Sequence, residues 1–94
     1  MEYQLRDYRV RPGELDEWLE EWREQVYPLR LANGFEVVGA WIAREESRFV
    51  WIIGHDDFQL ANDVYYASPE RAGMDPDPAR HLARVSETQL ERIV

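Results

Sequence analysis

The sequence contains no cysteine, no lysine and no long apolar run. Without thiols, the chain cannot form disulfides, cysteine-based zinc sites or a thiol nucleophile. No stretch approaches the roughly 18 apolar residues of a membrane-spanning helix. The first residues, Met1–Asp7, also lack the apolar core of a signal peptide, so we expect a cytoplasmic protein.

Charge of one sign dominates the sequence, because 19 acidic residues face only 11 arginines, which leaves a net charge of −8. An acidic chain repels nucleic-acid phosphates and anionic lipid surfaces. We therefore expect neither nucleic acid nor a membrane as a partner. At 94 residues, the chain is predicted to form a single domain over residues 1–94.

Aromatic residues are abundant, with four Trp and five Tyr among 13% aromatic residues. Rings of this size need a packed interior or an interface.

In the N-terminal third, residues 3–10 have the composition of a strand, and residues 14–32 follow the helical period. The helix stripe consists of Leu15, Trp18, Leu19, Trp22, Val26 and Leu29. Pro28 lacks an N–H, so it is predicted to kink this helix or loosen its last turn.

The middle of the chain predicts an antiparallel hairpin of strands 35–44 and 48–55, because only a short polar loop separates them. Asp56 or Asp57 is predicted to cap a following helix that runs to about residue 67.

The last quarter contains two prolines preceded by capping residues. Ser68-Pro69 predicts a short turn that stops at Gly73, and the segment 75–78 predicts a helix to about Arg84. Asp75 and Asp77 are interpreted as caps. Residues 86–94 are predicted to form the final strand.

The resulting order, β-α-β-β-α-β, predicts an α+β fold of the ferredoxin-like class, with one four-stranded antiparallel sheet and both helices on one face. Strand 48–55 is apolar on both sides, with Phe49 and Trp51 on one and Val50 and Ile52 on the other. A sheet face open to water would carry polar residues instead. We therefore predict a homodimer that packs sheet on sheet.

A series of short motifs extends along nearly the whole chain. They are Tyr3–Gly13, Leu15-Asp16, Trp18, Pro28-Leu29, Gly34, Val38-Gly39, Trp41, Asp56-Asp57 and Ser86–Thr88. In this order and spacing they resemble the NIPSNAP family within the dimeric α+β barrel superfamily.

The resemblance implies a barrel built from the sheets of two ferredoxin-like subunits. Relatives in the superfamily often hold an apolar ligand between sheet and helices, and some are cofactor-free oxygenases or degrade heme. The heme-degrading set of Asn, Trp and His is incomplete here, because strand 3–10 has no Asn. For NIPSNAP-type proteins themselves, the biochemical activity is mostly unsettled.

Three residues are candidates for catalysis. His55 shares a strand face with Trp51 and could act as a base or hydrogen-bond donor at a pocket rim; the alternative is a strand-end histidine bonded to the following cap. Tyr3 and Asp7 are predicted to face the same pocket, with an Asp7–Arg9 pair as polar handle. An exposed pair at the sheet edge fits that pattern equally well.

A flat aromatic slot is the predicted ligand site. Counting outward from the hairpin loop places Trp41 and Trp51 on one face with Val37 and Ile53, and Leu5 of strand 3–10 is expected to join them. Tryptophan offers rigid apolar area to a ring-shaped ligand. The alternative is that these residues only pack the core or the dimer interface.

The sequence predicts neither a metal nor another cofactor. Asp56 and Asp57 follow His55, but neighbouring strand residues point to opposite faces and His81 is far along the chain. Helix capping is the better interpretation of both aspartates.

Three functions remain open. The first is a homodimer that binds a small apolar or aromatic molecule. The second is a cofactor-independent monooxygenase-like enzyme in which His55 and Tyr3 or Tyr8 handle protons. The third is a structural or interaction dimer with a filled interior. An empty slot of about 300 Å³ beside Trp41, Trp51 and His55 would favour the first two.

Overall fold

Four antiparallel strands form one sheet in the computed structural model, which describes residues 1–94. The strands are β1 (Glu2–Val10), β2 (Glu36–Ala43), β3 (Arg48–His55) and β4 (Leu82–Leu90). Their spatial order is β2-β3-β1-β4, so β1 lies between β3 and β4. The predicted ferredoxin-like α+β order is therefore confirmed.

The first crossing over the sheet is helical from Leu15 to Ala32. It comprises α1 (Leu15–Glu21), a π-helical turn η1 (Trp22–Val26) and α2 (Tyr27–Ala32). A proline ring pushes against the carbonyl four residues earlier, which here belongs to the π turn. The wide turn before Pro28, in which the Tyr27 N–H bonds the Trp22 carbonyl, accommodates that disturbance. The predicted extent is confirmed, but the irregularity precedes Pro28 instead of loosening the last turn.

The second crossing contains α3 (Phe58–Ala67), α4 (Pro69–Ala72) and a single 3₁₀ turn, η3 (Pro78–His81). The helix predicted to reach Arg84 is wrong, since β4 already begins at Leu82. Residues 82–90 instead pair with β1 along its length, which satisfies their backbone groups in the sheet. Ser68 and Asp77 are caps as predicted, whereas no helix begins at Asp75.

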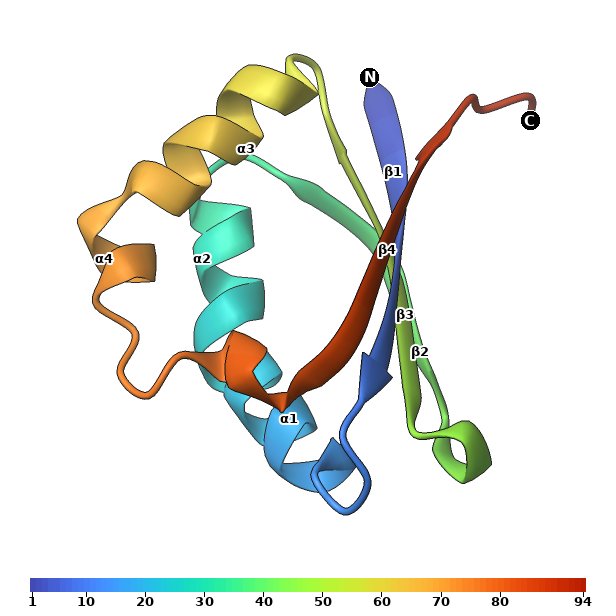
Figure 1. Ribbon diagram of the computed structural model, residues 1–94. Coiled ribbons are helices and arrows are strands. Elements are labelled where there is room, and N and C mark those ends of the chain that lie inside the picture. Colours follow the sequence, from blue (N-terminus) through green and yellow to red (C-terminus); the bar gives the residue numbers. More distant parts are fainter.

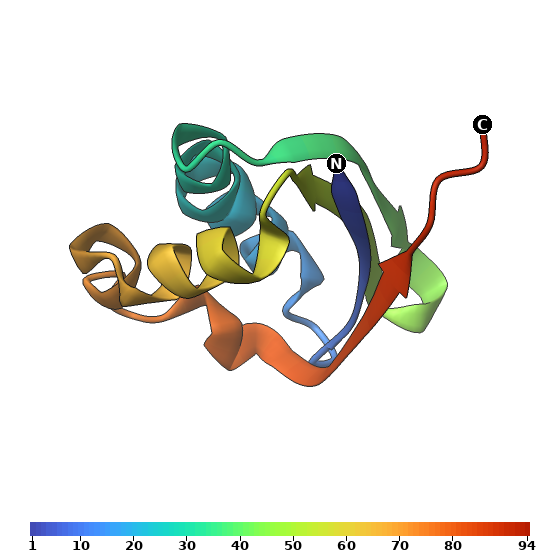
Figure 2. The ribbon, with the colours of Figure 1, turned by 90° about the horizontal axis from the view of Figure 1, so that it is seen from above.

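The helices of both crossings, α1 to α4 with η1 and η3, cover one face of the sheet and leave the other bare, as Figures 1 and 2 show. The 3₁₀ turn η2 (Arg44–Glu46) lies in the loop between β2 and β3. The core between the two layers is mostly aromatic. Its rings belong to Tyr8, Trp18, Trp22, Phe35, Phe49, Trp51, Phe58 and Tyr65. None of these helices has the length and apolar character needed to cross a membrane.

A β-bulge in β2 separates the two tryptophans that were predicted to share a face. Val37 lies opposite Ile53, but Gly39 lies opposite Ile52, so Val38 is the extra residue. One extra residue reverses the alternation of the rest of the strand. Trp51 is consequently on the covered face and 1% exposed, while Trp41 lies on the bare face and is 55% exposed. The prediction of a shared face is wrong for this reason.

Candidate functional site

A small cavity lies between the sheet and the helical layer. Its lining comprises Tyr8, Trp18, Val26, Arg30, Trp51, Tyr65, Tyr66, Arg71, Pro78, Ala79 and Leu82. The volume is about 40 Å³, which is room for a few water molecules. Most of the wall is hydrophobic, with five aromatic rings, and α4 and η3 form part of it.

Two arginines are buried in this region, and each is 1% exposed. Arg30 from α2 lines the cavity, and Arg6 from β1 lies behind its wall, bonded to Tyr8 and Tyr66. Both donate to the Asn62 side-chain carbonyl of α3, at 3.2 Å from Arg6 Nη2 and 2.9 Å from Arg30 Nη1. Both also donate to the Tyr66 hydroxyl, at 3.1 and 3.4 Å. Two guanidinium groups therefore share neutral acceptors on one helix.

Aromatic rings surround the Arg30 guanidinium. Its Cζ lies 3.7 Å from the centre of the Tyr65 ring and 4.7 Å from that of Phe35. Such cation–π contacts hold a cation away from water. Burial, followed by the charge of Arg6, lowers the pKa of Arg30. An arginine nevertheless keeps its proton in proteins, so the site carries two positive charges.

Negative charge near these two arginines is scarce. The Glu87 carboxylate lies 3.8 Å from Arg6 Nη2, and Glu87 is half-exposed. The bonds of Arg30 go only to Asn62 and Tyr66, which are neutral.

Several buried donors around the cavity have no partner. They are Arg30 Nε, Trp18 Nε1, Trp51 Nε1 and the Tyr65 hydroxyl. Burial raises the pKa of Tyr65, so its phenol retains the O–H. An unsatisfied buried donor costs about 1–3 kcal/mol. The donors around the cavity therefore have no acceptor within the chain.

The predicted ligand residues divide between the two faces. Trp51 lines the cavity, and Ile53 is fully buried beside it on the covered face, opposite the half-buried Val37. Trp41 and Leu5 lie on the bare face, where Leu5 pairs with Ile52. The structure therefore does not bring the predicted slot residues together.

His55 lies on the covered face but outside the cavity. Its Nδ1 accepts the Asp57 N–H at 2.9 Å, and its ring packs 5.2 Å from that of Phe35. This is the bond to the following helix start that was the alternative to a catalytic role.

The predicted capping by Asp56 or Asp57 is wrong in detail. Asp57 occupies the N-cap position of α3, but its side chain makes no capping bond. Glu2 takes that role, because its carboxylate accepts the Phe58 N–H at 2.8 Å. The pairing of Glu2 with His55 brings it to the helix start. Asp56 instead lies 3.4 Å from the N-terminal ammonium group.

Tyr3 and Asp7 lie on the bare face. The Tyr3 ring covers Gly54, where a Cβ would come within 2.7 Å of it, and its hydroxyl accepts from Arg92 Nη1 at 3.2 Å. Asp7 binds Arg48 through both oxygens, at 2.9 and 2.6 Å, and not Arg9 as predicted, because Arg48 is on the neighbouring strand. The hydrogen bonds from Arg48 lower the pKa of Asp7.

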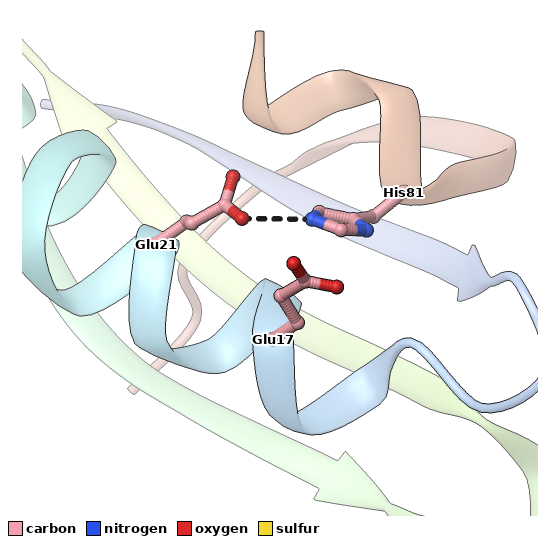
Figure 3. Close-up of side chains that lie close together, drawn as sticks. All are labelled: Glu17, Glu21 and His81. Carbon is pink, nitrogen blue, oxygen red and sulfur yellow. Dashed lines mark hydrogen bonds and ion pairs between the residues drawn. The ribbon is translucent and has the colours of Figure 1, made fainter. Parts of the chain in front are cut away.

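A second polar cluster joins α1 to η3, and Figure 3 shows three of its residues, Glu17, Glu21 and His81. The ring nitrogens of the buried His81 lie 2.7 Å from Glu14 and 2.9 Å from Glu21. Burial on its own lowers the pKa of His81, but the hydrogen bonds to Glu21 and Glu14 outweigh it and raise the pKa. A protonated ring donates from both nitrogens, as this geometry requires.

Metal binding is a poor match for this cluster. Arg80 already donates to both oxygens of Glu21, at 2.8 Å each. A metal would have to displace Arg80 and remove the proton from His81. The cluster has the chemistry of an ion-pair network that connects the two helical crossings, and the absence of a metal stays a prediction.

The sequence profile of the NIPSNAP family matches residues 3–88. The chain belongs to the NIPSNAP family. No curated protein matches it.

Solved structures share the fold of this NIPSNAP protein. An uncharacterized NIPSNAP domain protein from Burkholderia xenovorans is 17% identical with a TM-score of 0.86, over 99% of this chain and 95% of that one. A NIPSNAP family protein from Agrobacterium tumefaciens is 16% identical with a TM-score of 0.89, over 98% and 85%. An antibiotic biosynthesis monooxygenase is 17% identical with a TM-score of 0.73, over 100% of both chains. At these identities the likeness concerns the fold alone.

Sequence reasoning missed the two buried arginines. Arg6 has the parity of Tyr8, so alternation alone places it on the covered face. Arg30 was overlooked because the predicted stripe continued to Leu29. The π turn adds a residue to one turn of the helix, and beyond it the buried position is Arg30, four residues after Val26.

Proposed function

We propose that this NIPSNAP protein is a homodimer that binds a small aromatic or apolar molecule between the sheet and the helices of each subunit. The observation that carries the proposal is the cavity beside Tyr8, Trp51 and Tyr65, where buried donors lack partners. Ligand sites in proteins combine such apolar walls with a few directed polar groups.

The cavity is too small for a whole ligand as it stands. At about 40 Å³ it accepts only a small polar group in the present conformation. It is far below the roughly 300 Å³ slot that was expected to favour a ligand. Volume alone therefore agrees with the structural or interaction dimer, and the unpartnered donors are what support binding. A ring-sized body therefore requires the outer wall formed by α4 and η3 to move away from Trp51.

The bare face supports the dimer. Its apolar side chains are Leu5, Val38, Trp41, Val50, Ile52 and Leu90. Val38 and Trp41 are 48% and 55% exposed, which is unusual for contiguous large apolar residues. A second copy is the occupant that we propose, because a two-fold axis lets one apolar sheet face pack on itself.

The test combines assembly and binding. Light scattering at micromolar concentration should give twice the mass of the chain. Native mass spectrometry of untagged protein should detect a bound molecule, or calorimetry should detect binding of 2-naphthamide. A dimer that binds no aromatic compound would instead favour the structural or interaction dimer with a filled interior.

A cofactor-independent oxygenase is the second candidate. The observation that favours it is the pair of unpartnered donors, the Tyr65 hydroxyl and Trp51 Nε1, at a cavity in a fold shared with an antibiotic biosynthesis monooxygenase. Of the proton-handling residues predicted, His55, Tyr3 and Tyr8, only Tyr8 lines the cavity. Oxygen uptake with 1,4-dihydroxynaphthalene should exceed the buffer rate and fall in Tyr65→Phe. Equal uptake with and without protein excludes this activity for that substrate class.

A further inference from the structure

We infer that the molecule bound between sheet and helices carries a carboxylate, and that Arg30 receives this group with help from Arg6. The inference rests on the proposed ligand-binding function and specifies its ligand class.

Charge balance distinguishes Arg30 from other arginines of this chain. Five arginines have a carboxylate oxygen at 3.6 Å or closer, namely Arg9, Arg44, Arg48, Arg71 and Arg80. Arg30 is more deeply buried than any of them, yet its hydrogen bonds go only to Asn62 and Tyr66. A buried cation is costly unless an anion accompanies it. In a chain with 19 acidic residues, the missing anion is best explained as part of a ligand.

The free donors match a carboxylate in number and kind. Arg30 Nε, Trp18 Nε1, Trp51 Nε1 and the Tyr65 hydroxyl are buried, belong to residues that line one cavity and have no acceptor. The two oxygens of a carboxylate offer about four acceptor positions, as many as there are donors. Hydrogen bonds from an arginine to such a group are charge-assisted and therefore strong.

Cavity size favours the same group. A volume of about 40 Å³ accepts a planar group of three heavy atoms but not a phosphate ester with its larger body. Arg71 lies on the outer wall, with its Cζ 5.6 Å from the centre of the Tyr66 ring, and its charge is already paired with Asp77 at 3.0 Å. The rest of the ligand would extend past this wall.

The experiment compares each carboxylate with its neutral amide of equal shape. Calorimetry at low salt uses benzoate against benzamide and 2-naphthoate against 2-naphthamide. We expect the carboxylates to bind at least about ten-fold more tightly, because only they neutralise the buried guanidinium. Arg30→Gln should remove this preference. Arg44→Gln changes the net charge equally at an exposed ion pair and should retain it.

A second variant guards against misfolding of Arg30→Gln. Tyr65→Phe keeps the ring beside Arg30 and removes only the free hydroxyl, so it should fold normally and bind carboxylates several-fold more weakly. Equal affinity for carboxylates and amides would overturn the inference but leave the proposed function intact. No binding of either class would overturn both, and the two arginines would then be structural cations held by aromatic rings.

Discussion

The two faces of the sheet carry similar apolar residues, but only one face is buried. On the covered face, Phe49, Trp51 and Ile53 of β3 are at most 1% exposed beneath the helices. On the bare face, Val50 and Ile52 of the same strand remain partly exposed, and Trp41 is 55% exposed. Both crossings lie on one side of the sheet (Figure 2), so one chain completes only one of its two apolar layers.

Charged residues sharpen the same contrast. On the bare face, Asp7 and Arg48 satisfy each other with two hydrogen bonds. A neutralised pair of this kind tolerates contact with another protein surface. On the covered face, Arg30 has no carboxylate partner and retains a free donor. In our proposal, the bare face binds a second copy of the chain and the covered face binds a small molecule.

Truncation of the two tryptophans should give the largest difference between the two faces. Trp51→Ala is expected to lower the free energy of unfolding by about 3–5 kcal/mol, because it empties the centre of the covered layer. Trp41→Ala, on the bare face, should cost a monomer less than about 1 kcal/mol and weaken self-association instead. Urea unfolding and sedimentation measure the two effects. Equal losses of stability would contradict the difference between the faces.

A charge on the bare face should separate the subunits. Ile52→Asp or Val50→Asp would place an unpaired carboxylate in the sheet-on-sheet contact, at a cost of about 3 kcal/mol or more. Light scattering should then show a folded monomer. The matched control is Leu60→Asp on α3, which is 60% exposed on the helical side and should leave the dimer intact. A wild-type chain that is itself monomeric would refute the dimer.

The pH dependence of folding stability measures how much the ion-pair network at His81 contributes to holding the helices on the covered face. The raised pKa of His81 means that the imidazolium contributes stability fully below about pH 6.5 and that this contribution is lost as pH rises through the folded-state pKa. Arg80 lowers the pKa of Glu21, so that contribution is present above about pH 4.5 and is lost as pH falls through the lowered pKa.

In the variant His81→Gln, the loss in free energy of unfolding as the pH rises should therefore be smaller by about 1–2 kcal/mol. Urea midpoints of both proteins across the pH range provide the measurement. Zinc should leave the melting temperature of the wild type unchanged, because Arg80 occupies Glu21. A pronounced rise with zinc would show that Glu17, Glu21 and His81 bind a metal.

His55→Ala should have the smallest effect. It removes one hydrogen bond to the Asp57 N–H and one contact with Phe35, for a cost of about 0.5–1.5 kcal/mol. Because His55 lies outside the cavity, ligand binding should not change. Weaker binding without further loss of stability would restore its predicted role at the site.

Periodicity in the sequence determined most of the architecture. The alternation in β3 and the apolar stripe from Leu15 to Val26 depend on local geometry, since side chains repeat every 2.0 residues in a strand and every 3.6 in a helix. Those patterns were sufficient for the element order, the hairpin and the doubly apolar strand. The alternation in β1 also places Arg6 on the same face as Tyr8, although the sequence did not indicate that Arg6 is buried.

Only the tertiary structure decided where individual side chains lie. The bulge at Val38 moved Trp41 to the bare face, and the pairing of Glu2 with His55 gave Glu2 the capping role predicted for Asp56 or Asp57. The site itself depends on Asn62, which lies 56 residues from Arg6 and 32 from Arg30 in the chain. Such contacts carry no local period, because they arise only when the crossings pack on the sheet and bring distant polar groups into one low-dielectric space.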